Sequence, residues 1–172
     1  MVTMYTGRET AVRTAKHHAA VLAPLVADPT LKKATLAEVN AGHAIQCSIK
    51  EIGITGSPNN ESEQYICDED ATETAGATTW SITPLVLDAG NPQEANELVD
   101  NLVKGSILYV IERRGPVHDV EFATNDLVSI AKIEVSHVEW VEVTANTAGE
   151  KFRVRIHASV RKYERLATIA AS

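Results

Sequence analysis

Strict alternation of apolar and polar side chains marks the last third of the chain. Between Lys151 and Arg161 every second residue is apolar, which predicts a strand with one face in the core and one in solvent. A strand is also predicted from Asp126 to Val135. The inward face of the last strand comprises Phe152, Val154, Ile156, Ala158 and Val160, and its outward face comprises Lys151, Arg153, Arg155, His157 and Arg161.

A partner for this strand is predicted from Val138 to Thr144, in a hairpin. The register that brings the two sets of apolar residues together also places Glu142 opposite Arg153 and Trp140 opposite Arg155. Cross-strand charge and cation–π pairs of this kind each contribute roughly 0.2–1 kcal/mol. The sequence therefore predicts this register.

The middle of the chain predicts one helix followed by a buried strand. Asn91 is a good N-cap, Pro92 suits the first helical position, and Gly105 ends an apolar stripe at helical spacing. From Ser106 to Glu112 both faces are apolar, which is typical of a strand that is buried on both sides. The helix is expected to cover one side, leaving the other for a second sheet or a neighbouring subunit.

The first part of the chain has weaker patterns. Residues 1–18 show no apolar period and predict an arm that is loose in the monomer, ahead of a single domain from residue 19 to 172. Residues 19–27 predict either a short helix or a packed extended segment. Leu31 to Ala41 predicts a turn of helix that ends at Gly42.

Two strands are predicted around a polar connection. Alternation predicts one strand from Ala44 to Ile54 and another from Thr78 to Leu87. The second is expected to reach a sheet edge near Pro84, which has no N–H to donate. Residues 55–77 contain six acidic and no basic side chains and are predicted to form an extended acidic loop, because connections of this length are usually functional or disordered.

Charge and cysteine content narrow the possible functions. The chain has 172 residues and a formal net charge of −7, which argues against a nucleic-acid-binding module. A negatively charged surface does suit a protein past which DNA moves without binding, because it repels the phosphates. Cys47 and Cys67 lack zinc-site spacing and are predicted as free thiols, with a disulfide open only if their strands are neighbours. Neither a signal peptide nor a membrane span is predicted.

No catalytic motif stands out, so no enzyme activity, cofactor or metal is predicted. Asp68-Glu69-Asp70 with Glu73 resembles a loose calcium loop but lacks the EF-hand frame. The basic face of the last strand, which includes Arg155, offers either a nucleic-acid contact or a solvated face paired with acidic neighbours. The overall charge favours the second interpretation.

Three segments between Asn91 and Val135 carry a more specific resemblance. From about residue 40 onward, the order of elements resembles the tail-tube (major tail) proteins of long-tailed bacteriophages. Asn125 stands where glycine is common in that family, and Asn tolerates the left-handed conformation. The segments are Pro92-Gln-Glu-Ala-Asn-Glu-Leu-Val-Asp-Asn-Leu, Ile107-Leu-Tyr-Val-Ile-Glu-Arg-Arg-Gly115 and Asn125-Asp-Leu-Val-Ser-Ile130.

The resemblance implies a mainly β (α+β) fold, a β-sandwich or rolled antiparallel sheet with one flanking helix and a long loop. It implies six-fold rings that stack into a tube in the virion tail, assembled in the host cytoplasm. It also implies relatives in contractile injection machines, including the type VI secretion tube. Implied partners are further copies of the chain, a tape-measure protein and other tail proteins, with DNA only as passing cargo and no membrane.

Candidate self-assembly contacts follow from this picture. Two alternatives stay open: another ring-forming tail component, such as a tail terminator or connector, and a monomeric cation-binding domain. The candidate contacts are Glu61, Glu63, Tyr65, Asp68, Glu69, Asp70, Tyr109, Arg113 and Arg114.

Overall fold

The computed structural model describes residues 18–46, 49, 52–63, 72–89, 100, 102–141 and 152–171. Within these ranges no helix is long and apolar enough to cross a membrane. The elements are β1 (His18–Ala23), β2 (Lys33–Thr35), α1 (Leu36–Asn40), β3 (His43–Ala44), β4 (Ile54–Glu63), β5 (Thr72–Ile82), β6 (Leu85–Ala89), β7 (Ile107–Arg114), β8 (Leu127–Trp140) and β9 (Phe152–Ala170).

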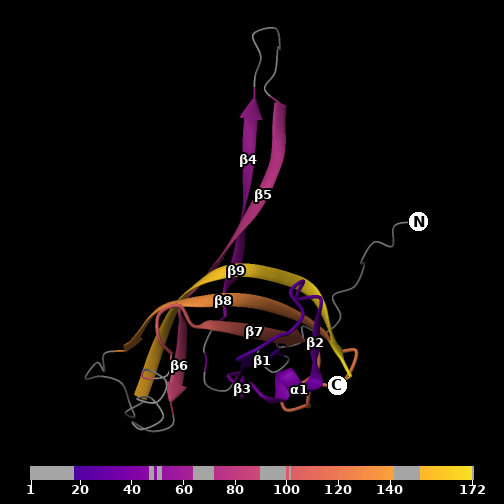
Figure 1. The fold of residues 1–172 in the computed structure, drawn as a ribbon, viewed down its shortest axis with the longest axis vertical. Helices are drawn as coiled ribbons and strands as arrows, with labels where there is room; N and C mark the ends of the chain where they lie inside the picture. Colours follow the sequence, from indigo (N-terminus) through magenta and orange to yellow (C-terminus); the bar gives the residue numbers. More distant parts are fainter. Residues whose placement is uncertain are drawn as a thin grey trace, which may run out of the picture.

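Seven strands form one rolled sheet, and β4 and β5 form a separate two-stranded hairpin. The order in the large sheet is β2-β9-β8-β7-β1-β3, and β6 also pairs with β9. All its pairings are antiparallel except that of β2 with β9. Figure 1 shows β7, β8 and β9 lying side by side and bending together. The predicted mainly β fold with a rolled sheet is confirmed.

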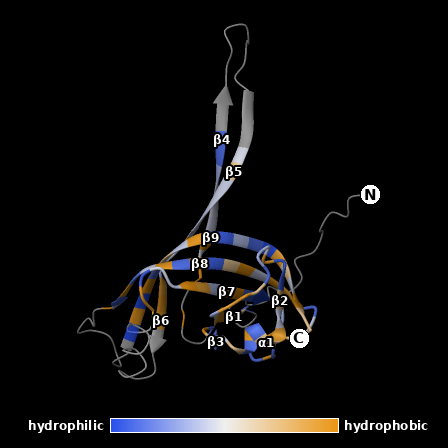
Figure 2. Cartoon of the chain, viewed as in Figure 1, coloured by the Kyte–Doolittle hydropathy of each residue, from blue (hydrophilic) through white to orange (hydrophobic). Residues whose placement is uncertain are grey.

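The two faces of the rolled sheet carry two cores. Figure 2 shows hydrophobic and hydrophilic residues alternating along its strands. Because successive side chains of a strand point to opposite faces, Val110 of β7 joins the first core and Ile111 the second. β7 is therefore buried on both faces, as its sequence predicts. The first core comprises Ala20, Leu22, Ile45, Leu85, Leu87, Val110, Ala131, Ile133, Val135, Val154 and Ile156. The second comprises Val21, Ala23, Val26, Leu31, Ala34, Val39, Tyr109, Ile111, Val128, Ile130, Ala167 and Ile169.

Segments of the same chain cover both faces near the middle of the sheet. β6 contributes Leu85 and Leu87 to the first core, and the segment around α1 contributes Val39 to the second. The prediction that one face of β7 is left to be covered by a second sheet or a neighbouring subunit is therefore wrong at this position. The helix predicted after Asn91 falls mostly outside the described residues.

The short helix α1 lies where a turn of helix is predicted. Thr35 is its N-cap and forms a capping box with Glu38: the Glu38 N–H donates to the Thr35 hydroxyl, and the Glu38 carboxylate accepts from the Thr35 N–H. The helix ends before Gly42, as predicted. Residues 19–23 are extended within β1, which agrees with the second of the two alternatives, and His18 belongs to this strand rather than to an arm. Residues 1–17 lie outside the described part of the chain.

Two predictions in the first half of the chain are wrong. The strand expected from Ala44 ends there: the Ile45 N–H still donates to the Ala20 carbonyl of β1, but the chain then turns, with the Ile49 N–H donating to the Ile45 carbonyl. The acidic loop expected at residues 55–77 is instead mostly strand, since β4 and β5 occupy its two arms. The strand expected from Thr78 to Leu87 is divided at Pro84, and its second half is β6, which pairs with β9 outside the main strand order.

The strands at the end of the chain are longer than predicted, and their register differs by one residue. β8 continues through both predicted strands to Trp140, which pairs with Val154, and Glu139 pairs with Arg155. Each pair from Val138 to Trp140 is one residue away from the predicted register, and a further register shift follows between Val135 and His137. Glu142 and the predicted turn lie outside the described residues.

Candidate assembly surfaces

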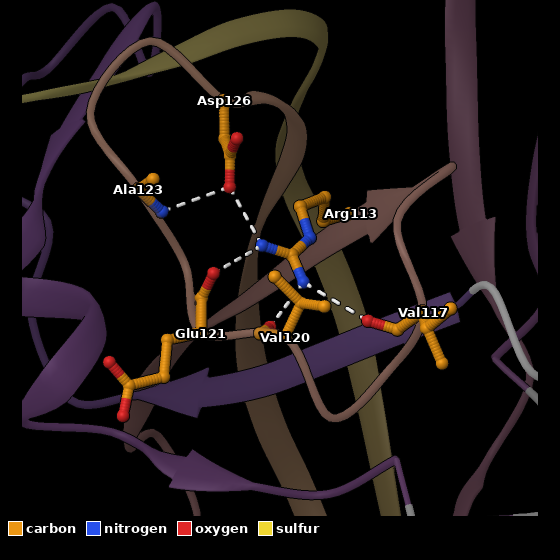
Figure 3. Close-up of polar contacts among 6 residues, drawn as sticks. All are labelled: Arg113, Val117, Val120, Glu121, Ala123 and Asp126. Carbon is orange, nitrogen blue, oxygen red and sulfur yellow. Dashed lines mark hydrogen bonds and ion pairs between the residues drawn. The ribbon is translucent and has the colours of Figure 1, made fainter.

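Arg113, at the end of β7, organises the loop that follows it (Figure 3). Its side chain is only 2% exposed. One guanidinium nitrogen, Nη1, donates to the Glu121 carbonyl at 2.8 Å and to Asp126 Oδ2 at 2.7 Å. The other, Nη2, donates to the carbonyls of Val120 and Val117. The planar guanidinium thus joins four points of one loop.

Further contacts fix the same loop against the second core. Phe122 lies under the guanidinium, 4.5 Å from ring centroid to Cζ, and packs against the second core. Asp126 Oδ2 also accepts from the Ala123 N–H at 3.0 Å. Asn125 has a φ of 71°, which confirms the left-handed conformation expected of it, and its N–H donates to the Ile169 carbonyl. The loop therefore closes this end of the second core.

These contacts make Asp126 sensitive to acid. Burial acts to raise its pKa, but the hydrogen bonds from Ala123 and Arg113 and the Arg113 charge outweigh burial, so the pKa is lowered. The carboxylate therefore stabilises the fold above the unfolded pKa of about 4, and this contribution is lost as pH falls through the lower folded pKa. Asp126→Asn is expected to make the fall in unfolding free energy between about pH 5 and pH 2 shallower in urea titrations. Identical slopes for the variant and the unchanged protein would contradict this.

The hairpin of β4 and β5 extends away from the rolled sheet (Figure 1). Its strands pair from Ile54 with Ile82 at the base to Glu63 with Thr72 near the tip. Residues 55–60 and 76–79 are all exposed. Because an isolated two-stranded hairpin is marginally stable in water, this segment has little support from its own subunit beyond the base.

The base of the hairpin is anchored on the sheet. Ile54 and Ile82 pack against the first core. The Trp80 ring meets the Tyr163 ring of β9 edge-on, with centroids 4.6 Å apart. Gly56 leaves room for this tryptophan, since a Cβ there would lie 2.8 Å from Trp80 Cζ3. The hairpin is thus held firmly at one end only.

One edge of β9 is open over much of its length. On this edge β6 pairs with residues 152–156 and β2 with residues 168–170. Between them, at residues 157–167, no strand of the described chain pairs with this edge. An open strand edge presents N–H and C=O groups to any further strand.

The polar face of β8 and β9 carries several ion pairs. Glu139 accepts from Arg155 at 3.0 Å and lies 3.1 Å from His157 Nε2, and these partners lower its pKa, with the His157 hydrogen bond contributing most. Arg161 bonds to Glu134 at 2.6 Å. This agrees with a solvated face that pairs with acidic neighbours and leaves the nucleic-acid interpretation without support.

The predicted contact residues separate into four groups. Tyr109 and Arg113 lie in the interior of the subunit, whereas the Arg114 side chain is 73% exposed. Glu61 and Glu63 belong to β4, and the other four candidates lie outside the described residues, as do both cysteines. Among the described residues no three His, Cys, Asp or Glu side chains are placed to hold a metal ion. The long alternation in the sequence predicted the strand β9. Nothing in the sequence indicated that one edge of this strand lacks a pairing strand at residues 157–167.

Comparison with known proteins places this arrangement in a family. No curated protein matches the chain. Among solved structures, a chain of the anti-feeding prophage baseplate, described as a cryo-EM structure with six-fold symmetry applied, matches with a TM-score of 0.46 and 8% identity over 97% of this chain and 98% of that one. The family model described as phage tail tube protein matches residues 8–172. The chain therefore belongs to the phage tail tube protein family.

Proposed function

We propose that this protein is the repeating subunit of a phage tail tube, in which six copies form a ring and rings stack along a common axis. Membership of the family makes it a structural component of a tail. The ring, the stack and the passage of DNA go further and rest on the surfaces of the subunit. No catalytic role is proposed.

The observation that carries the proposal is the open edge of β9 at residues 157–167. A strand from a neighbouring copy that adds to this edge continues the sheet from one subunit to the next. The contact joins two different surfaces, so it repeats around an axis and closes into a ring when the rotation per subunit allows it. The sheet then becomes the wall of the ring.

Stacking is assigned to the hairpin of β4 and β5. It extends beyond the body of the subunit and contributes little to either core past its base. A segment of this kind gains order from a second subunit that buries part of it. The hairpin is therefore the natural contact between successive rings.

The charge of the chain suits a conduit for DNA. With a net charge of −7 the subunit offers no general attraction to phosphates. DNA is proposed to pass through the bore as cargo, and a tape-measure protein and other tail proteins are the proposed partners. Assembly in the host cytoplasm follows from the same role.

Negative-stain electron microscopy of the purified protein tests this function. Rings at low concentration that extend into tubes as concentration rises are the expected result. Single rings that never extend would support a tail terminator or connector instead. Monomers at every salt and protein concentration would contradict both.

A further inference from the structure

At the end of β7, the two faces of the sheet differ in how far they are covered by other parts of the chain. On the face of the second core, Arg113 and the loop after it close the end of the sheet. On the face of the first core, Glu112 and Arg114 follow Val110 in the same alternation; Glu112 is buried and contacts His18 and Arg114, whereas the Arg114 side chain is 73% exposed. The result is an open groove of about 410 Å³. It is lined by Glu112, Arg114, Leu127, Val128, Ser129, Tyr163, Arg165 and Leu166.

The groove contains the two most exposed large apolar side chains of the described residues, Leu127 and Leu166. Leu166 is 75% exposed and Leu127 is 63% exposed, the highest values among the large apolar side chains that are described. They lie on adjacent strands, β9 and β8, near the pair formed by Val128 and Ala167. Two neighbouring exposed leucines in a concave site are typical of a surface that a partner covers.

The charges of the groove distinguish between possible occupants. Arg114 and Arg165 flank the leucines, and the only carboxylate, Glu112, is 3% exposed and already bonds to His18 and Arg114. The groove therefore favours an acidic partner with an apolar centre.

Two segments of the chain are candidates for this partner. Residues 1–17 carry Arg8, Arg13 and Lys16 against a single carboxylate, which is the wrong sign. The hairpin sequence from residue 55 to 77 has six carboxylates, no basic residue, and the apolar group Tyr65-Ile66-Cys67 between its acidic arms. The hairpin sequence thus matches the groove in both charge and apolar content.

The hairpin of the same subunit starts beside the groove, and its described strands point away from the sheet (Figure 1). Tyr163 forms one wall of the groove and contacts Trp80 at the base of that hairpin, while the strands lead away from the sheet (Figure 1). We propose that the groove between Leu127 and Leu166 receives the hairpin tip of another copy, with Arg114 and Arg165 contacting its carboxylates. This inference rests on the proposed stacking and names the surface on which it occurs.

A cysteine-pair experiment tests the contact directly. The full chain carrying Cys47→Ser and Leu166→Cys retains the native Cys67 of the hairpin. Under mild oxidation with diamide, a disulfide between Cys67 of one copy and the introduced thiol of another is expected, detected by non-reducing gel and peptide mass spectrometry. Such a bond requires Cα atoms within about 7 Å. The matched control is Val103→Cys in the same background, because Val103 is 62% exposed but lies outside the groove.

The outcomes separate the inference from the function on which it rests. Linkage through Leu166→Cys and not through Val103→Cys supports the groove, and adding Arg165→Glu should lower its yield about fivefold. Tubes that form without this linkage would overturn the groove and leave the proposed function standing. Neither tubes nor linkage would overturn both.

Discussion

Arg113→Ala is expected to lower the free energy of unfolding by about 3 kcal/mol. The substitution leaves the Asp126 carboxylate and the carbonyls of Glu121 and Val120 without their donor at the end of the second core. Urea unfolding measures the loss, and hydrogen exchange at the amides of residues 117–126 should rise with it. The large effect is expected because the guanidinium is almost fully buried and makes several bonds at once.

Arg114→Ala is the matched control for this prediction. Its side chain is exposed and contacts the Glu112 carboxylate at 3.2 Å, so its loss should cost less than about 1 kcal/mol. Arg113→Lys keeps the charge but not the planar fork, and should recover only part of the stability. Equal losses for Arg113→Ala and Arg114→Ala would refute the role given to the buried arginine.

Shortening the hairpin is expected to abolish tubes while leaving the subunit folded. A two-residue Asn-Gly turn that joins Pro58 directly to Thr78, which already face each other across the hairpin, preserves the base and removes the acidic tip. No described residue of either core is lost. The melting temperature should therefore change by less than about 3 °C, while microscopy should show rings that do not stack.

A second variant separates the length of the hairpin from its charge. Replacing the carboxylates from Glu61 to Glu73 with the corresponding amides keeps the chain length and removes the attraction to the arginines of the groove. Tubes should then be shorter or need higher protein concentration. Tubes of ordinary length from the shortened protein would contradict the assignment of stacking to the hairpin.

Local patterns in the sequence predicted those elements whose side chains meet the core. The inward positions Val154 and Ile156 of β9 are fully buried, and the strand with two apolar faces, β7, separates two cores. The turn of helix before Gly42 and the left-handed Asn125 were equally accessible, because each depends on residues close in sequence. Burial and local backbone preference both determine which residue types occur at a position, so they can be predicted from the sequence.

Other features of the fold could not be predicted from the sequence. Beyond their base, at residues 55–60 and 76–79, β4 and β5 are exposed on both faces, so this part of their sequence has no apolar alternation to reveal it. A charged residue such as Arg113 is expected at the surface, and only the folded loop shows that its two terminal nitrogens, Nη1 and Nη2, find acceptors inside. The groove joins residues of β7, β8 and β9. The sequence predicted a register only between the last two strands, one residue out, and none with β7, so the groove could not be assembled from the sequence.

The position of the open edge along the chain has a consequence for synthesis. β9 follows every other described strand, so it leaves the ribosome after them. Until it has emerged and paired with β8, a nascent chain lacks the edge at residues 157–167 to which a neighbour would add. If neighbours add to this edge, as proposed, polymerisation on the polysome is delayed until translation has passed this strand.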